Sequence, residues 1–119
     1  MKTHAANDKL SSLIKLVEDK GVEVKSIIKS LKDLRESALV EQDPLVTKVL
    51  RLSYEYLEEN KSFDVEAQFE EDEEGNEYPV EMESKDNLLY LLNLLVKADH
   101  KINREEIKDY RTALKADLY

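Results

Sequence analysis

The chain has 119 residues, a formal net charge of −9 and no cysteine. This length fits a single domain, residues 1–119, around one core, and the lack of cysteine excludes disulfides and thiolate metal sites. No apolar run reaches the roughly 18 residues of a membrane span, and the first eight residues are too polar for the apolar stretch of a signal peptide. We therefore expect a cytoplasmic protein with no membrane partner.

The negative charge is concentrated in the middle of the chain. Residues 54–98 hold 3 Lys and Arg against 14 Asp and Glu, a net charge of −11, whereas residues 1–53 hold 10 against 8 and residues 99–119 hold 5 against 5. A block of this kind repels nucleic acid and attracts basic partners.

Three helices are expected between residues 7 and 61. Only two Gly and two Pro interrupt the chain, which favours long helices. Asn7 or Asp8 is the expected N-cap of the first helix, and Gly21 ends it. The second helix is expected over about 24–39. The third begins at Asp43-Pro44, with Asp as N-cap and Pro at the first helical position, and ends near residue 61.

The periodicity changes to two in the acidic segment, residues 62–83. Apolar residues alternate with polar ones over 63–69 and again over 78–82, on either side of an Asp72–Asn76 turn. This pattern predicts a β-hairpin, and Pro79 marks its second strand as an edge or a bulge. Because an isolated hairpin is only marginally stable, we expect its apolar face to pack on the helices.

A helical hairpin is expected over residues 84–119. Ser84 is the expected cap of a leucine-rich fourth helix, which is apolar on nearly all sides and so belongs at the centre of the core. After a short loop, Asn103 and Glu106 have the spacing of a capping box, and Ile102 and Ile107 that of a hydrophobic staple. These pairs predict the start of a fifth helix, which runs to the C-terminus.

The predicted fold class is therefore mainly α: about five helices in a small bundle, with one β-hairpin inserted between the third and fourth. The core is expected to contain Leu13, Ile14, Val17, Ile27, Leu31, Val49, Leu50, Leu88, Leu91, Leu92, Leu95, Ile107 and Leu114.

No pattern of catalytic residues stands out. His4 and His100 have no recognisable nucleophile beside them, and the abundant carboxylates show no sign of the burial that a general acid needs. The spacing over residues 70–81 matches an EF-hand calcium loop, but Glu stands where Asp or Asn is expected, and the alternating flanks do not favour the required helices. We expect no enzyme activity, no cofactor and no metal site, and keep calcium binding as a remote alternative.

The acidic block provides the leading hypothesis for function. A folded acidic surface can imitate the phosphates of DNA and occupy the basic groove of a nucleic-acid-processing enzyme. The size and charge suit a phage-type inhibitor, a DNA mimic, or an anti-restriction or immunity protein, with a basic protein as partner. The competing interpretation is a solubilising surface that protects a hairpin edge. The expected partner-binding residues are Glu66, Glu70, Glu71, Asp72, Glu73, Glu74, Glu77, Glu81 and Glu83.

A basic stripe on the second helix supports an alternative. Helical spacing places Lys25, Lys29, Lys32 and Arg35 on one side, where they could follow the phosphates of a nucleic acid. Asp33 and Glu36 interrupt this stripe, as on an ordinary solvated helix face. The alternative function is a nucleic-acid-binding accessory protein of phage type.

Two short segments resemble known families. The leucine-rich stretch 88–96 followed by Lys97-Ala98-Asp99-His100-Lys101-Ile102-Asn103-Arg104-Glu105-Glu106 is similar to the helix–loop–helix of TerB-like domains, with His100 in place of their glycine. Residues 27–54, with two apolar stripes separated by Asp43-Pro44, resemble small double-stranded-DNA-binding phage proteins. The first implies a TerB-like module and the second a DNA-binding role. Neither assigns a role to a particular residue.

Overall fold

The computed structural model describes residues 1–119, of which 69% are helical. Its elements are α1 (His4–Lys20), α2 (Val24–Val40), α3 (Pro44–Asn60), β1 (Phe69–Glu71), β2 (Glu77–Pro79), α4 (Ser84–Val96) and α5 (Lys101–Leu118). The predicted fold class is confirmed: five helices form a bundle, and the hairpin β1–β2 lies between α3 and α4. None of these helices is both long and apolar enough to cross a membrane.

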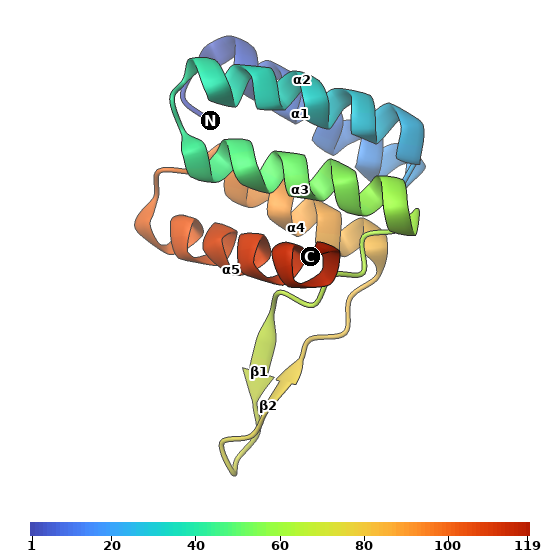
Figure 1. The fold of residues 1–119 in the computed structure, drawn as a ribbon, viewed down its shortest axis with the longest axis vertical. Helices are drawn as coiled ribbons and strands as arrows, with labels where there is room; N and C mark the ends of the chain where they lie inside the picture. Colours follow the sequence, from blue (N-terminus) through green and yellow to red (C-terminus); the bar gives the residue numbers. More distant parts are fainter.

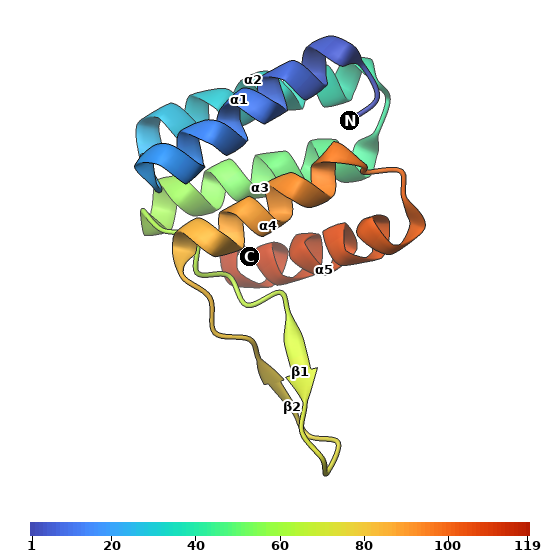
Figure 2. The same ribbon diagram turned by 180° about the vertical axis from the view of Figure 1, so that it is seen from behind.

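The helices form three layers, which Figures 1 and 2 show from opposite sides. α1 and α2 form one outer layer, α3 and α4 lie in the middle, and α5 lies on the other side of them. The hairpin leaves the body beside α5 and extends away from it. A single cluster of 28 buried residues fills the space between the layers, so all five helices share one core.

The predicted core is nearly complete. Every residue expected in it is buried except Ile14, which is half-buried against its edge. The expectation for α4 is confirmed, because five of its leucines are buried. Its position in the middle layer explains why apolar residues occur on nearly all of its sides.

The start of α1 differs from the prediction. Thr3 is the N-cap, and its Oγ1 accepts a hydrogen bond from the Ala6 amide at 3.2 Å. Asn7 and Asp8 lie inside the helix. Glu41, in the turn after α2, also accepts hydrogen bonds from the backbone amides of Lys2 and Thr3. Thr3 is therefore an ordinary local N-cap, but the contact with Glu41 that holds it in place is far away in the sequence and could not be predicted. The end of α1 at Gly21 is confirmed, with φ at 73°.

The turn between α2 and α3 closes α2 with a left-handed residue. The Asp43 amide donates to the Ala38 carbonyl at 3.1 Å, and Gln42 between them has φ at 57°. This is the arrangement in which glycine is usual, because a side chain is disfavoured there. The predicted start of α3 is confirmed: Asp43 accepts a hydrogen bond from the Val46 amide, and Pro44 is the first helical residue.

Replacing Gln42 with glycine should raise the free energy of unfolding by about 0.5–1 kcal/mol, because glycine adopts a positive φ without the steric penalty. Chemical denaturation measures the change. The matched control is Lys48→Gly inside α3, which should lower the free energy of unfolding by about 1 kcal/mol. A loss of stability in Gln42→Gly would show that the Gln42 side chain contributes more than its backbone strain costs.

The start of α5 corrects a second prediction. The helix begins at Lys101 after the N-cap His100, which makes no side-chain capping bond. Asn103 lies within the first turn, and its Nδ2 donates to the Lys97 carbonyl at 3.2 Å. It therefore closes the end of α4 instead of capping α5. Ile102 is 66% exposed, so the predicted staple with Ile107 does not form.

Ser84 also differs from its predicted role. Glu83 is the N-cap position of α4, and Ser84 is its first residue. The Ser84 hydroxyl accepts a hydrogen bond from the Phe63 amide at 3.1 Å and donates to Asp64 at 2.6 Å. The residue thus ties the two ends of the hairpin segment together. A capping motif is local in sequence, whereas this contact spans twenty residues.

The hairpin is shorter than the alternation suggests. Only three residues pair in each strand, with Phe69 opposite Pro79 and Glu71 opposite Glu77. The segment before β1 is extended and buries Phe63, Val65 and Ala67, but both strands are exposed on both faces. The expected packing on the helices therefore holds for the base of the hairpin alone. We call residues 69–79 the arm.

Candidate functional site

A buried polar network holds the base of the arm. The Asn87 side chain, on α4, donates through Nδ2 to the backbone carbonyls of Phe63 at 3.0 Å and Val65 at 2.8 Å. Its Oδ1 accepts a hydrogen bond from the Tyr110 hydroxyl of α5 at 2.6 Å. The Gln68 Nε2 in turn donates to the Tyr110 oxygen at 3.0 Å. The segment leading into the arm is therefore fixed to both α4 and α5.

Burial raises the pKa of Tyr110 to about 12, so its hydroxyl stays protonated and available as a donor to Asn87. The tyrosine ring also stacks on the ring of Phe63, with a centroid distance of 6.2 Å. Together these contacts fix the direction in which the arm leaves the bundle.

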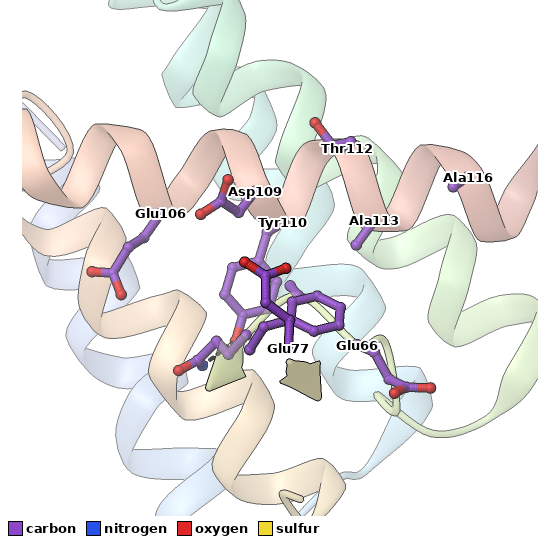
Figure 3. A pocket seen from close by; sticks show the side chains of 11 residues that line it. Glu66, Glu77, Glu106, Asp109, Tyr110, Thr112, Ala113 and Ala116 are labelled. Atoms are coloured by element: carbon purple, nitrogen blue, oxygen red, sulfur yellow. Dashed lines mark hydrogen bonds between the residues drawn. The ribbon is translucent and has the colours of Figure 1, made fainter. Parts of the chain in front are cut away.

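A groove of about 570 Å³ lies between this segment, the arm and α5. Its apolar lining comes from Ala67, Phe69, Tyr110, Ala113 and Ala116. Four carboxylates also line it, those of Glu66, Glu77, Glu106 and Asp109, and no lysine or arginine does. In the view of Figure 3, Glu106 and Glu66 lie toward opposite ends of the groove, with Glu77 and Tyr110 between them. The groove therefore combines an apolar lining with uncompensated negative charge.

Two carboxylates of the groove, those of Glu106 and Asp109, are close enough for one to affect the other. Burial raises the pKa of Asp109, and the negative charges of Glu105 and Glu106 raise it further. Glu106 accepts a hydrogen bond from the Tyr90 hydroxyl, which raises the pKa of Tyr90 to about 12. A bound cation would relieve this repulsion, because an opposite charge nearby favours the ionised carboxylate.

The strands of the arm carry a further repulsive pair. Glu71 and Glu77 are direct cross-strand partners, and like charges in this position destabilise a sheet. Phe69 and Pro79 form the next pair but one, so the aromatic ring lies on the same face of the arm as these two carboxylates. Phe69 is 55% exposed and Tyr78, on the opposite face, is 45% exposed. The arm thus presents aromatic rings and carboxylates to solvent together.

The tip of the arm is a closed turn. The Asp72 carboxylate accepts hydrogen bonds from the backbone amides of Asn76 and Glu74, both at 2.9 Å, and the bond from Asn76 is the main cause of its lowered pKa. Gly75 supplies the left-handed residue of this turn, with φ at 83°. Strands flank the turn, so the helices of an EF-hand are missing. No group of three or more His, Asp or Glu residues is arranged to hold a metal ion.

The nine predicted acidic residues are all exposed, but they lie on different sides of the arm and of the segments that join it to the bundle, and do not form one face. Glu66 and Glu77 line the groove, whereas Glu70 lies on the other face and accepts a hydrogen bond from Tyr78. Asp72, Glu73 and Glu74 form the tip. Glu81 and Glu83 follow β2 on the way to α4.

Sequence reasoning missed Glu106 and Asp109. Their spacing of three residues, one turn of a helix beside Tyr110, was visible in the sequence. What could not be seen is that the segment entering the arm runs alongside this face of α5.

The basic stripe of α2 is divided in the structure. Lys32 forms an ion pair with Glu58 of α3 at 3.4 Å and lies over the Tyr54 ring. Arg35 lines a separate pocket between α2 and α3. Lys25 and Lys29 are exposed and take part in none of the ion pairs. The four residues therefore do not act as one free row of charge.

Comparisons with protein-family models, with curated proteins and with solved structures gave no match. Any functional proposal must therefore be based on the geometry and charge of this chain.

Proposed function

We propose that the protein is a non-enzymatic binding protein that places its acidic arm and groove on a basic macromolecular partner. The observation that carries the proposal is the groove between the arm and α5, which has four carboxylates, an apolar lining and no cation. Its volume of about 570 Å³ falls in the range of pockets that receive a ligand group, roughly 300–1,000 Å³. An arginine or lysine side chain of the partner has the chemistry to enter it.

Arginine suits this groove best. Its planar guanidinium pairs with carboxylates and stacks on aromatic rings, and Phe69 and Tyr110 both line the groove beside the carboxylates. The positive charge of the partner would neutralise Glu77 and Asp109, which form no ion pair within the chain. This interaction supplies affinity at one place, whereas the remaining carboxylates of the arm act at longer range.

The arm itself provides the steric part of the proposed mechanism. It extends away from the body (Figures 1 and 2) and can enter a concave surface that the bundle cannot. Its exposed acidic residues would accelerate association with a basic groove, and Phe69 and Tyr78 would add contact area once it is seated. Occlusion of a nucleic-acid site by such an arm is the action of an inhibitor, of the anti-restriction, immunity or DNA-mimic kind.

The test compares wild type with two variants in capture from lysate, with and without nuclease treatment. In the first variant, Asn-Gly replaces residues 69–79; because the Val80 amide donates to the Gln68 carbonyl at 2.9 Å, a tight turn can join these residues. In the second, Glu77 and Asp109 become Gln and Asn. The matched control is Glu18→Gln with Asp19→Asn, two exposed carboxylates of α1.

We expect the arm replacement to abolish capture of the basic partner and the groove variant to weaken it at least tenfold, as for loss of charge-assisted hydrogen bonds. The α1 control should bind like wild type. Binding of wild type should also weaken with salt, because screening removes the long-range attraction. Equal capture by all four proteins would refute the proposal. Capture that disappears on nuclease treatment would instead favour the nucleic-acid accessory function.

The same arm replacement provides a test of folding. Because residues 69–79 are exposed on both faces, their removal should change the free energy of unfolding by less than about 0.5 kcal/mol. Thermal denaturation followed by circular dichroism measures this. A loss of several kcal/mol would show that the arm stabilises the bundle, and the capture experiment would then depend on the groove variant alone.

A further inference from the structure

A second pocket, of about 390 Å³, lies between α2 and α3 and has the opposite character to the acidic groove. Three cationic side chains line it, those of Arg35, Lys48 and Arg51, and the apolar part of its lining comes from Leu39 and Pro44. The residues of this pocket belong to α2, α3 and the turn between them, whereas the arm leaves the body beside α5 (Figure 1). In a chain of net charge −9, this concentration of positive charge needs an explanation.

Two of the three cations have no carboxylate partner. Arg35 and Lys48 take part in none of the ion pairs of the structure, and Arg51 has a single long pair with Glu55 at 3.6 Å. The Arg35 Nε is enclosed by protein and has no hydrogen-bond acceptor. Solvated surface cations, such as Lys25 and Lys29, are not held in this way.

The one carboxylate in the lining is already neutralised from another side. Asp43 accepts hydrogen bonds from both terminal nitrogens of Arg104 on α5, at 2.9 and 3.1 Å. Its charge is therefore not available to compensate Arg35 or Lys48. Thr47 and Gln42 add neutral polar side chains to the same lining, and Gln42 keeps its disfavoured left-handed backbone there.

We propose that this pocket binds the phosphate group of a small phosphorylated molecule. Guanidinium groups match the oxygens of a phosphate with paired donors, and lysine adds a point charge. A polyanion is the less favoured ligand because the acidic arm and the net charge of the chain repel it. The proposal is independent of the function proposed for the arm.

The test is a titration of ¹⁵N-labelled protein at constant ionic strength, with inorganic phosphate, ribose 5-phosphate and a short DNA duplex as separate probes. We expect saturable shifts of the Arg35, Thr47 and Lys48 resonances with the sugar phosphate, and weaker shifts of the same resonances with inorganic phosphate. Tighter binding of free phosphate than of the sugar phosphate would identify the free ion as the ligand and overturn the assignment to a phosphorylated molecule.

The variants Arg35→Gln and Lys48→Gln should each weaken sugar-phosphate binding by about tenfold, the usual loss for one charge-assisted hydrogen bond. The matched control Lys25→Gln removes an exposed cation of the same helix and should bind like wild type. The proposal is overturned if neither phosphate shifts these resonances saturably, if Arg35→Gln and Lys48→Gln bind unchanged, or if the duplex alone binds. Because Arg35 has an enclosed side-chain nitrogen and Lys48 does not, the Lys48 variant remains informative if Arg35→Gln fails to fold.

Discussion

Replacing Asn87 with leucine should lower the free energy of unfolding by about 3 kcal/mol, although leucine is similar in size and more apolar. The Asn87 side chain makes three buried hydrogen bonds, to the Phe63 and Val65 carbonyls and to the Tyr110 hydroxyl. Leucine would leave both carbonyls without their side-chain donor, and each buried unsatisfied group costs roughly 1–3 kcal/mol. Urea denaturation measures the change.

Asn93→Leu is the matched control for this prediction. Asn93 lies on the same helix, is exposed, and donates only to the Leu89 carbonyl one turn before it. Its replacement should change the free energy of unfolding by less than about 0.5 kcal/mol. If the two variants were equally stable, the carbonyls of the segment entering the arm would have other partners, and the network would not determine the direction of the arm.

Replacing Asp43 with alanine should cost about 3 kcal/mol of unfolding free energy. Asp43 caps α3 through the Val46 amide and pairs with Arg104 through two hydrogen bonds. Loss of an N-cap costs about 1 kcal/mol, and loss of one partner of a buried ion pair costs 3–5 kcal/mol. The cost of losing the ion pair is lower here, because the Arg104 side chain is 33% exposed and therefore partly solvated. Thermal denaturation provides the measurement.

Asp43→Asn separates the two contributions, because asparagine keeps the cap and removes the charge. It should cost about 2 kcal/mol, whereas Asp33→Asn, at an exposed residue of α2 without an ion pair, should be neutral. A loss in Asp43→Asn as large as in Asp43→Ala would assign the whole effect to the charge.

The cost of Asp43→Asn should also depend on pH. The hydrogen bonds from Arg104 lower the pKa of Asp43 in the folded protein, against the opposing effect of burial. A lowered folded pKa gives stability that is complete above the unfolded pKa of about 3.9 and is lost as pH falls through the folded value. The difference between wild type and Asp43→Asn should therefore be constant from pH 6 to about 5 and shrink below about pH 4. A difference independent of pH would contradict the ion pair.

The fold could be predicted well because its main signals are local and periodic. Apolar spacing located the five helices, and Asp43-Pro44 and Gly21 marked two boundaries that the structure confirms. The errors share one cause. Ser84 and Asn103 each bond to a backbone group outside the start of their own helix, and Thr3 is held at the start of α1 by Glu41. These partners become visible only when the chain is folded.

The candidate site was predictable only in part. The acidic block located the arm, but neither Glu106 nor Asp109 stood out in the helix that forms the other wall of the groove. The basic pocket could not be predicted for a similar reason: helical spacing places Arg35 in a row on α2, whereas Lys48 and Arg51 reach the pocket from α3. Both the acidic groove and the basic pocket are formed by residues from two or more segments of the chain. The sequence pattern of one helix or strand therefore shows only part of each site.

The arm also means that the chain need not be continuous for the bundle to assemble. Residues 62–84 contain no lysine or arginine, so trypsin cannot cut within the arm, whereas a glutamate-specific protease can cut after Glu73 at its exposed tip. Such a cut would separate α1–α3 from α4–α5, yet α1 packs on α4 and α3 packs on α5. The shared core would keep the two pieces together. The tip of the arm is therefore the place at which we would divide the chain to express its two parts separately and recombine them.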